Sequence, residues 1–302
     1  MISVIMPCYR PNFRLLYKAI ESLSTQTYDN FELIICGDHN TKDEKKSINK
    51  VIDSFKKLKI SYIENMKIPG ISYTRNKAAE KAKGEWLVWL DCDDTLENDC
   101  IEKLHTCALK QKVNYVIGQC NVISKHIVRR KTSKDFFELH KRYRASIYDP
   151  FMLNVTAIQP QLIKRSIFLD MGGFSVDYKK AELTEFLLRY LSLYPSMTIS
   201  FSCDAEYNYN KDALDSVSKG RKELFEYRRR ALLEYAMRNE VEIDDIVYLG
   251  RDIKKDIPLY VPIKNGVLIY RIPYRNNTEV SFEEVNDLVG NGEKLDVHSS
   301  YK

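Results

Sequence analysis

Short apolar runs alternate with longer helix-spaced segments over the first 118 residues. The apolar runs lie at 2–6, 31–36, 60–63 and 86–90, and the segments between and after them predict helices at 12–24, 42–58, 71–83 and 97–111. Strands that are apolar throughout and separated by helices predict a parallel sheet with helices on both faces. This pattern restricts the chain to an α/β fold.

The rest of the chain is less regular. Strands are predicted at 115–118, 197–201, 257–261 and 266–270, helices at 160–170, 181–193 and 220–239, and an irregular polar stretch at 121–158. We therefore expect one domain over 1–219, with halves that meet near 118. A C-terminal helix and a small strand-bearing extension are expected over 220–302.

Composition narrows the class of protein but not its chemistry. Hydrophobic residues at 44% and charged residues at 29% exclude collagen-like, disordered and membrane-spanning chains. The seven cysteines are odd in number and form no Cys-x-x-Cys pair, which indicates reduced thiols. No basic-then-apolar leader precedes the first strand and no apolar run reaches spanning length, so we expect a cytoplasmic protein.

Three aspartates follow the fourth predicted strand within four positions, in Asp91-Cys92-Asp93-Asp94. Crowded carboxylates repel one another unless a cation or buried donors compensate. Mg²⁺ and Mn²⁺ prefer such oxygen ligands and keep open positions for water and phosphate. The alternative is that Asp94 caps the next helix and the other two aspartates are solvated.

Several short motifs occur in a recognisable order and spacing. They are Pro7-Cys8-Tyr9-Arg10, Gln26-Thr27-Tyr28, Arg75-Asn76, Gly84-Glu85-Trp86, Asp91-Cys92-Asp93-Asp94 and, further on, Gly172-Gly173-Phe174. Together they resemble the N-terminal half of family 2 glycosyltransferases, most clearly over 2–118. The resemblance implies a GT-A (Rossmann-like) fold, with a mostly parallel sheet flanked by helices. It also implies that 1–118 binds a nucleotide-sugar and that 119–219 receives the acceptor.

The resemblance further implies the residues that bind the donor, a UDP-sugar, and its Mn²⁺ or Mg²⁺ ion. Pro7 and Tyr9 would lie against the base, Asp38 would read the uracil, and Arg75 would lie near the nucleotide. In the family's Asp-x-Asp motif, the last aspartate ligates the metal and the first faces the ribose or the metal's water shell; these positions are Asp93 and Asp91.

The chain departs from the family in its second half. The family's catalytic aspartate follows a glutamate soon after Gly-Gly-Phe, but here Leu183 follows Glu182. Glu182 or Glu185 would then serve as the general base of an inverting transfer, with Glu182 nearer the expected site; surface ion pairs are the alternative role for both. Asp212 or Ala213 stands where a metal-binding histidine is expected, and only Asp212 could be a metal ligand.

These departures leave other functions open. A non-catalytic sugar-nucleotide-binding protein would keep the donor site and lack the base. A nucleotidyltransferase is less favoured, because no glycine-rich loop follows the first strand. The sequence does not separate glycan, lipid-linked, protein and nucleic-acid acceptors, and it leaves the oligomeric state open. A lipid-linked acceptor would bring the enzyme to the inner face of a membrane.

Overall fold

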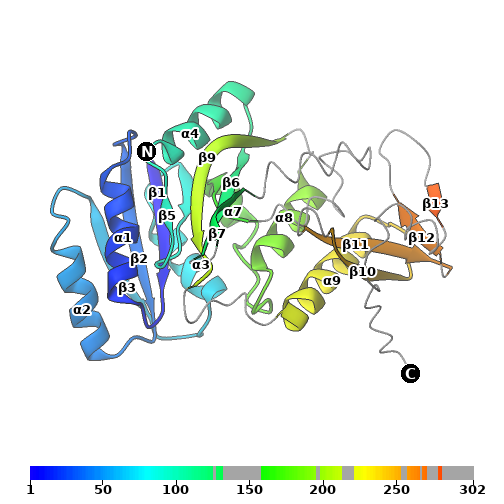
Figure 1. The fold of residues 1–302 in the computed structure, drawn as a ribbon, viewed down its shortest axis with the longest axis horizontal. Helices are drawn as coiled ribbons and strands as arrows, with labels where there is room; N and C mark the ends of the chain where they lie inside the picture. Colours follow the sequence, from blue (N-terminus) through cyan, green and yellow to red (C-terminus); the bar gives the residue numbers. More distant parts are fainter. Residues whose placement is uncertain are drawn as a thin grey trace.

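The structure, a computed structural model, describes residues 1–124, 127–131, 158–194, 198–212, 221–252, 257–265, 267–270 and 278–280. At its centre lies one large mixed sheet with helices on both faces, and a smaller sheet lies beyond it toward the C-terminal end (Figure 1). The described residues thus form the α/β architecture that the sequence predicts.

The large sheet has the strand order β3-β2-β1-β4-β8-β6-β9-β5, and β7 pairs with β6 at one side. Its strands are β1 (Ile2–Cys8), β2 (Phe31–Asp38), β3 (Ile60–Asn65), β4 (Trp86–Trp89), β5 (Thr95–Leu96), β6 (Tyr115–Ser124), β7 (Ile127–Lys131), β8 (Gln161–Lys164) and β9 (Ile199–Asn210). The first four in sequence are parallel to one another, whereas β8 runs antiparallel to both β4 and β6. As a result β1, β2, β4 and β6 all end at the same edge of the sheet.

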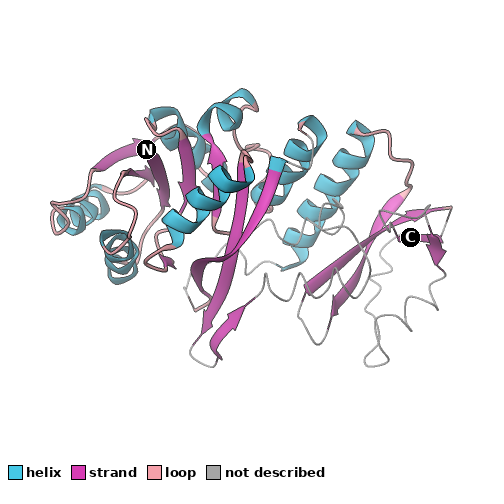
Figure 2. Ribbon diagram, turned by 90° about the horizontal axis from the view of Figure 1, so that it is seen from above, coloured by secondary structure: helices cyan, strands magenta, loops and turns pink. Residues whose placement is uncertain are grey.

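Side-chain alternation along the strands divides the core into two layers. One layer packs beneath α1 (Phe13–Ser24), α2 (Lys42–Ile52) and α4 (Cys100–Gln111). The other packs beneath α3 (Ile71–Lys81), α7 (Arg165–Asp170) and α8 (Glu182–Leu193). Figure 2 shows the helices on both sides of the strands. On β1 the alternation is direct, since Val4 faces the first layer and Ile5 faces the second.

Local sequence signals set several helix starts. The Asn12 side chain accepts hydrogen bonds from the backbone N–H groups of Arg14 and Leu15 and so caps α1. Thr41 and Glu44 form a reciprocal capping box at the start of α2. Both helices therefore begin directly after the strand ends that carry Cys8 and Asp38, and this fixes the loops at that edge.

The main correction to the sequence prediction concerns residues 160–170. They do not form one helix: β8 comes first, and the helix α7 begins only at Arg165. Leu162 and Ile163 point to opposite core layers between β4 and β6, and a helix could not present both in this way. Residues 121–124 likewise continue β6 instead of starting the irregular stretch, of which 132–157 lie outside the described residues.

The part after residue 220 contains the predicted helix and more strands than the sequence predicts. The helix α9 (Arg221–Arg238) packs on α8 through a small apolar cluster that includes Leu188 and Leu232. Four strands form an antiparallel sheet: β10 (Asp245–Asp252), β11 (Ile257–Lys264), β12 (Val267–Tyr270) and β13 (Thr278–Val280). A domain boundary near 220 stays a prediction.

Two adjacent glycines hold the turn after α7 next to α3. Gly172 and Gly173 have φ angles of +78° and +72°, and a Cβ on Gly173 would lie 2.5 Å from the Asn76 Oδ1 atom, whereas one on Gly172 would meet nothing within 4 Å. Asn76 also receives the Phe174 backbone N–H and donates to the Phe174 carbonyl, each at 2.8 Å. The turn thus binds α3 through one asparagine.

We expect Gly172→Ala to destabilise the fold by about 1–2 kcal/mol, the cost of a left-handed conformation for a residue with a Cβ. Gly173→Ala should lower the free energy of unfolding by that amount plus about 1–3 kcal/mol for the overlap with Asn76. Urea denaturation of the two variants measures the difference, because each serves as the control for backbone strain in the other. Equal losses would contradict the tight contact between Gly173 and Asn76.

Candidate active site

A buried arginine joins side chains from distant parts of the sequence at the edge where the parallel strands end. Arg75, on α3, is 1% exposed; its Nη2 atom lies 2.6 Å from Asp91 Oδ1 and its Nη1 atom lies 2.6 Å from Glu182 Oε1. Burial alone would lower the pKa of Arg75, but the charges of Asp91 and Glu182 raise it well above the ordinary value. Arg75 is therefore a fixed cation between two carboxylates.

The loop after β4 is tied to β9 by its last aspartate. Asp94 is buried, and its carboxylate accepts hydrogen bonds from the Tyr207 hydroxyl at 2.6 Å and from the Asn210 backbone N–H at 2.6 Å. The Tyr207 oxygen in turn accepts the Asp91 backbone N–H at 3.3 Å. These bonds replace the helix cap that was the alternative role for Asp94, since α4 begins later, at Cys100.

Asp93 lies in the same loop with part of its side chain open to solvent. Burial, followed by the charge of Asp91, raises the pKa of Asp93 to about 6. Burial and the charges of Asp93 and Asp91 also raise the pKa of Asp94 well above its usual range. Three carboxylates crowded in this way favour a bound cation. Both oxygens of Asp94 are engaged by protein groups. Asp93 is partly exposed, and Asp91, which Arg75 engages through Oδ1, keeps 28% of its side chain exposed, so these two are the candidates to hold the cation.

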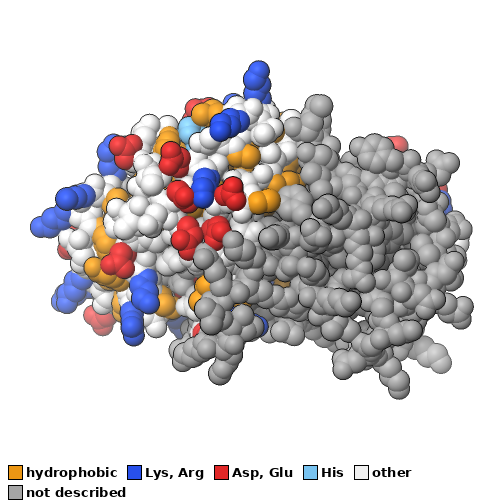
Figure 3. All heavy atoms as spheres, turned by 45° about the horizontal axis from the view of Figure 1, so that its top comes forward, with side chains coloured by type: hydrophobic (Ala, Val, Ile, Leu, Met, Phe, Trp, Pro, Cys, Tyr) orange, Lys and Arg blue, Asp and Glu red, His pale blue; other side chains and the backbone are white. Residues whose placement is uncertain are grey.

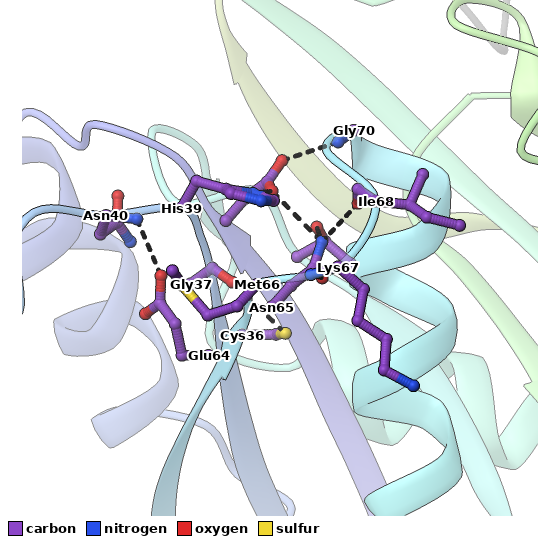
Figure 4. Close-up of polar contacts among 12 residues, drawn as sticks. Cys36, Gly37, His39, Asn40, Glu64, Asn65, Met66, Lys67, Ile68 and Gly70 are labelled. Carbon is purple, nitrogen blue, oxygen red and sulfur yellow. Dashed lines mark hydrogen bonds and ion pairs between the residues drawn. The ribbon is translucent and has the colours of Figure 1, made fainter.

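Asp38, at the end of β2, is a further acidic residue at this edge of the sheet. Its Oδ2 atom accepts the Gly70 backbone N–H at 2.8 Å, and its Oδ1 atom lies 3.2 Å from Asn65 Nδ2 and 2.8 Å from His39 Nδ1. Figure 4 shows Asn65 and Gly70 on the segment that leads from β3 into α3. Asp38 is thus held from two sides at the edge of the sheet.

One asparagine fixes the loop that follows β1. Asn40 donates to the Cys8 carbonyl at 2.8 Å and accepts the Arg10 backbone N–H at 3.0 Å, and its own backbone N–H donates to Glu64 (Figure 4). Tyr9, between Cys8 and Arg10, is left 54% exposed beside Asp38's strand. Of the two predicted base contacts, Pro7 is buried on β1, beside the strand that carries Asp38, and Tyr9 directly follows β1. Asn40 was not among the predicted site residues.

The two candidate bases have different surroundings. Glu182 begins α8 and contacts Arg75, which places it beside the Asp91 loop. Both oxygens of Glu185 are bound by Arg189, at 2.7 and 3.0 Å, and Arg189 also donates to the carbonyls of Met171 and Gly173. Glu185 thus holds Arg189, which binds the turn after α7, whereas Glu182 contacts Arg75 at the edge where the strands end. Leu183 packs against the second core layer.

Asp212 lies just past the end of β9, two residues after Asn210, and its carboxylate accepts the Ser124 hydroxyl at 3.4 Å. Ala213 falls outside the described residues. Among the residues that the structure describes, no three His, Cys, Asp or Glu side chains converge on one point as a preformed metal centre. A metal held at Asp93 and Asp91 would therefore complete its coordination with phosphate oxygens and water.

Comparison with known proteins identifies the family. The family model of glycosyl transferase family 2 matches residues 3–171, more than half of the chain. The chain belongs to glycosyl transferase family 2. Among the family members, TarP of Staphylococcus aureus, a poly(ribitol-phosphate) β-N-acetylglucosaminyltransferase, is 29% identical over 68% of this chain and 61% of its own length. WfaP of Escherichia coli, a UDP-Glc:α-D-GlcNAc-diphosphoundecaprenol β-1,3-glucosyltransferase, is 38% identical over 31% of this chain and 36% of its own length.

The chain spans less than two thirds of the length of either relative. Among solved structures, residues 1–349 of S. aureus TarS in complex with UDP-GlcNAc superpose with a TM-score of 0.62 at 16% identity, over 80% of this chain and 70% of that one. The mannosyltransferase PcManGT from Pyrobaculum calidifontis, in complex with GDP-Man and Mn²⁺, gives a TM-score of 0.57 at 17% identity, over 81% and 65%. These similarities confirm the GT-A fold of this family member.

The tie between Asp94 and Tyr207 predicts a loss of stability when the hydroxyl is removed. Tyr207→Phe should lower the free energy of unfolding by about 1–3 kcal/mol, because a buried carboxylate oxygen of Asp94 loses its donor. Tyr17→Phe, at an exposed position on α1, is the control and should change it by less than about 0.5 kcal/mol. Equal stability of the two variants in urea denaturation would show that the hydrogen bond from Tyr207 to Asp94 does not stabilise the fold.

Proposed function

We propose that the protein transfers a sugar from a UDP-sugar to an acceptor hydroxyl with inversion, assisted by Mn²⁺ or Mg²⁺ at Asp93 and Asp91. The contact of Arg75 with both Asp91 and Glu182 carries this proposal. It brings a carboxylate of the donor half and a carboxylate of the acceptor half to one point at the strand edge. An inverting transfer needs both: a cation site for the leaving diphosphate and a base on the opposite side of the sugar.

The donor would lie along the sheet edge. Tyr9 and Pro7 at the end of β1 and Asp38 at the end of β2 would hold the uracil, since β1 and β2 are neighbours and Tyr9 exposes its ring. Next along the edge, Asp91 and Asp93 follow β4, the other neighbour of β1. A metal ion bound there, with Asp212 as a further candidate ligand, would neutralise charge on the leaving diphosphate.

Glu182 is the residue best placed to accept the proton of the acceptor hydroxyl. Arg75 keeps it beside the strand edge, and one of its oxygens is engaged by that arginine, which leaves the other for a hydroxyl. Glu185 is held on both oxygens by Arg189 and is the weaker candidate. Glu182 would occupy this role in place of the family aspartate, whose position holds Leu183.

The acceptor is proposed from chemistry shared by the relatives. Their names state a diphosphoundecaprenol-linked sugar for WfaP and a poly(ribitol-phosphate) for TarP, both of which are hydroxyl-rich and anionic. We infer an acceptor of one of these two kinds, reached in the cytoplasm at the inner face of a membrane. No helix in the described part of the chain is long and apolar enough to cross a bilayer. On the described part of the face in Figure 3, acidic side chains gather around a basic one.

If Glu182 is the base, Glu182→Gln should lower kcat by about 10²–10⁴-fold and leave the affinity for UDP unchanged. Glu185→Gln is the matched control: both substitutions should lower the melting temperature, since Arg75 and Arg189 each lose a charged partner, but Glu185→Gln should keep kcat within about threefold. The measurement is release of UDP from labelled UDP-sugars with lipid-linked and polyol-phosphate acceptors. Tight UDP binding without turnover in the wild type would instead favour a non-catalytic sugar-nucleotide-binding protein.

The raised pKa of Asp93 predicts how metal affinity depends on pH. A carboxylate must lose its proton to bind Mn²⁺, so affinity should be near its maximum at pH 7.5 and fall about tenfold per pH unit below 6. Calorimetry with MnCl₂ and UDP at pH 7.5, 6.0 and 5.0 measures this. Asp93→Asn should bind Mn²⁺ weakly at all three pH values, whereas a wild-type affinity independent of pH would contradict a role for Asp93.

A further inference from the structure

Buried amide side chains at the start of β8 lack complete hydrogen bonding. Gln159, just before β8, is 6% exposed, and neither its Nε2 nor its Oε1 atom has a hydrogen-bond partner in the described part of the chain. Gln161, at the start of β8, is fully buried; its Oε1 atom accepts the Tyr115 hydroxyl at 2.7 Å, but its Nε2 atom has no partner there. Each such atom costs about 1–3 kcal/mol. Buried polar atoms without partners call for a ligand or an ordered water.

Strand pairing places these amides next to the Asp91 loop. Because β8 runs antiparallel to β4, the start of β8 lies at the edge where β4 ends. The register pairs Leu162 with Val88, and one further step sets Gln161 beside Trp89, two residues before Asp91. Gln159 extends past the pairing at that same edge. The amides are therefore the next groups along the edge after Asp91.

Gln161 also faces the core layer beneath the helix that carries the candidate base. Ile117 pairs with Gln161 across β6 and β8, and Ile117 belongs to the core layer beneath α3 and α8. Arg75 and Glu182 come from those two helices. A molecule bound at Gln159 and Gln161 would therefore lie between the Asp91 loop and the start of α8.

The hydrogen-bonding chemistry of the two side-chain amides fits a sugar. An amide both donates and accepts hydrogen bonds, as does each hydroxyl of a pyranose, and it adds no charge beside the carboxylates. The strand order β2-β1-β4-β8 puts the proposed uracil contacts first, the diphosphate next and the amides third, at about 4.8 Å per strand. This is the order of the parts of a UDP-sugar, so the transferred sugar fits better than the acceptor.

We propose that Gln159 and Gln161 form the subsite that binds the hydroxyl groups of the transferred sugar. The proposal rests on the proposed function, because it needs the nucleotide to lie over β1 and β2. With this subsite, the proposed acceptor half would also take part in recognising the donor. The amide donors and acceptors that lack protein partners would then distinguish sugars by the orientation of their hydroxyls.

The test compares UDP with UDP-GlcNAc and UDP-glucose by calorimetry in MnCl₂. In Gln159→Met, which keeps the side-chain length, UDP should bind within twofold of the wild-type affinity, while the sugar nucleotide that the wild type binds best should bind about tenfold more weakly. The melting temperature should not fall, because the lost amide has no protein partner. Gln161→Met gives the same comparison of affinities if Gln159→Met does not fold, but its melting temperature should fall because the Tyr115 hydroxyl loses its acceptor. Gln111→Met, at the exposed end of α4, is the control.

Several results would overturn the subsite. It fails if both variants bind the sugar nucleotides as the wild type does, whether or not transfer to an acceptor slows, because the amides then hold water or acceptor. It also fails if the wild type binds no sugar nucleotide more tightly than UDP. A wild type that does not bind UDP at all would refute the proposed function itself, which separates that failure from failure of the subsite.

Discussion

The contact of Arg75 with Asp91 and Glu182 is the interaction on which the arrangement of this protein depends. The two carboxylates lie 16 and 107 positions from the arginine in sequence, on different elements of the fold. Removing one partner of a buried ion pair costs about 3–5 kcal/mol, because the remaining charge stays buried. The guanidinium therefore holds α8 against the end of β4, and it leaves its own Nε atom without a partner among the described residues.

Around this contact, some polar residues of the edge are bound by protein groups, and others stay open to a cation. Asp94 and Asn76 are occupied by protein groups, the first by Tyr207 and Asn210 and the second by the backbone of Phe174. They fix the loop after β4 and the turn after α7. Because these contacts and the ion pair of Asp91 with Arg75 hold the loops, Asp93 need not contribute to their position. Asp93, and the exposed part of Asp91, can stay accessible to a cation, although the mutual repulsion of the two carboxylates is unfavourable when no cation is bound.

Much of this edge could be predicted from the sequence, because the signals are local. Apolar runs followed by Asp38 and Asp91 place both residues at strand ends, and parallel pairing brings strand ends together. The role of Asp94 could not be predicted, since its partner Tyr207 lies 113 positions away on a strand whose length the sequence underestimates. The strand β8 was missed for a related reason: four residues beside a helix carry too little periodicity to separate strand from helix.

The pairing of Glu182 with Arg75 also bears on how a family member could work without the usual aspartate. Arg75 engages the Oε1 atom of Glu182 at 2.6 Å, so an acceptor hydroxyl would approach the other carboxylate oxygen. The arginine contacts Asp91 as well, so any group that binds at Asp91 changes the charge that Glu182 experiences. A donor diphosphate near Asp91 would compete with both carboxylates for Arg75. The one arginine would thereby couple occupancy of the donor site to the position of the Glu182 side chain.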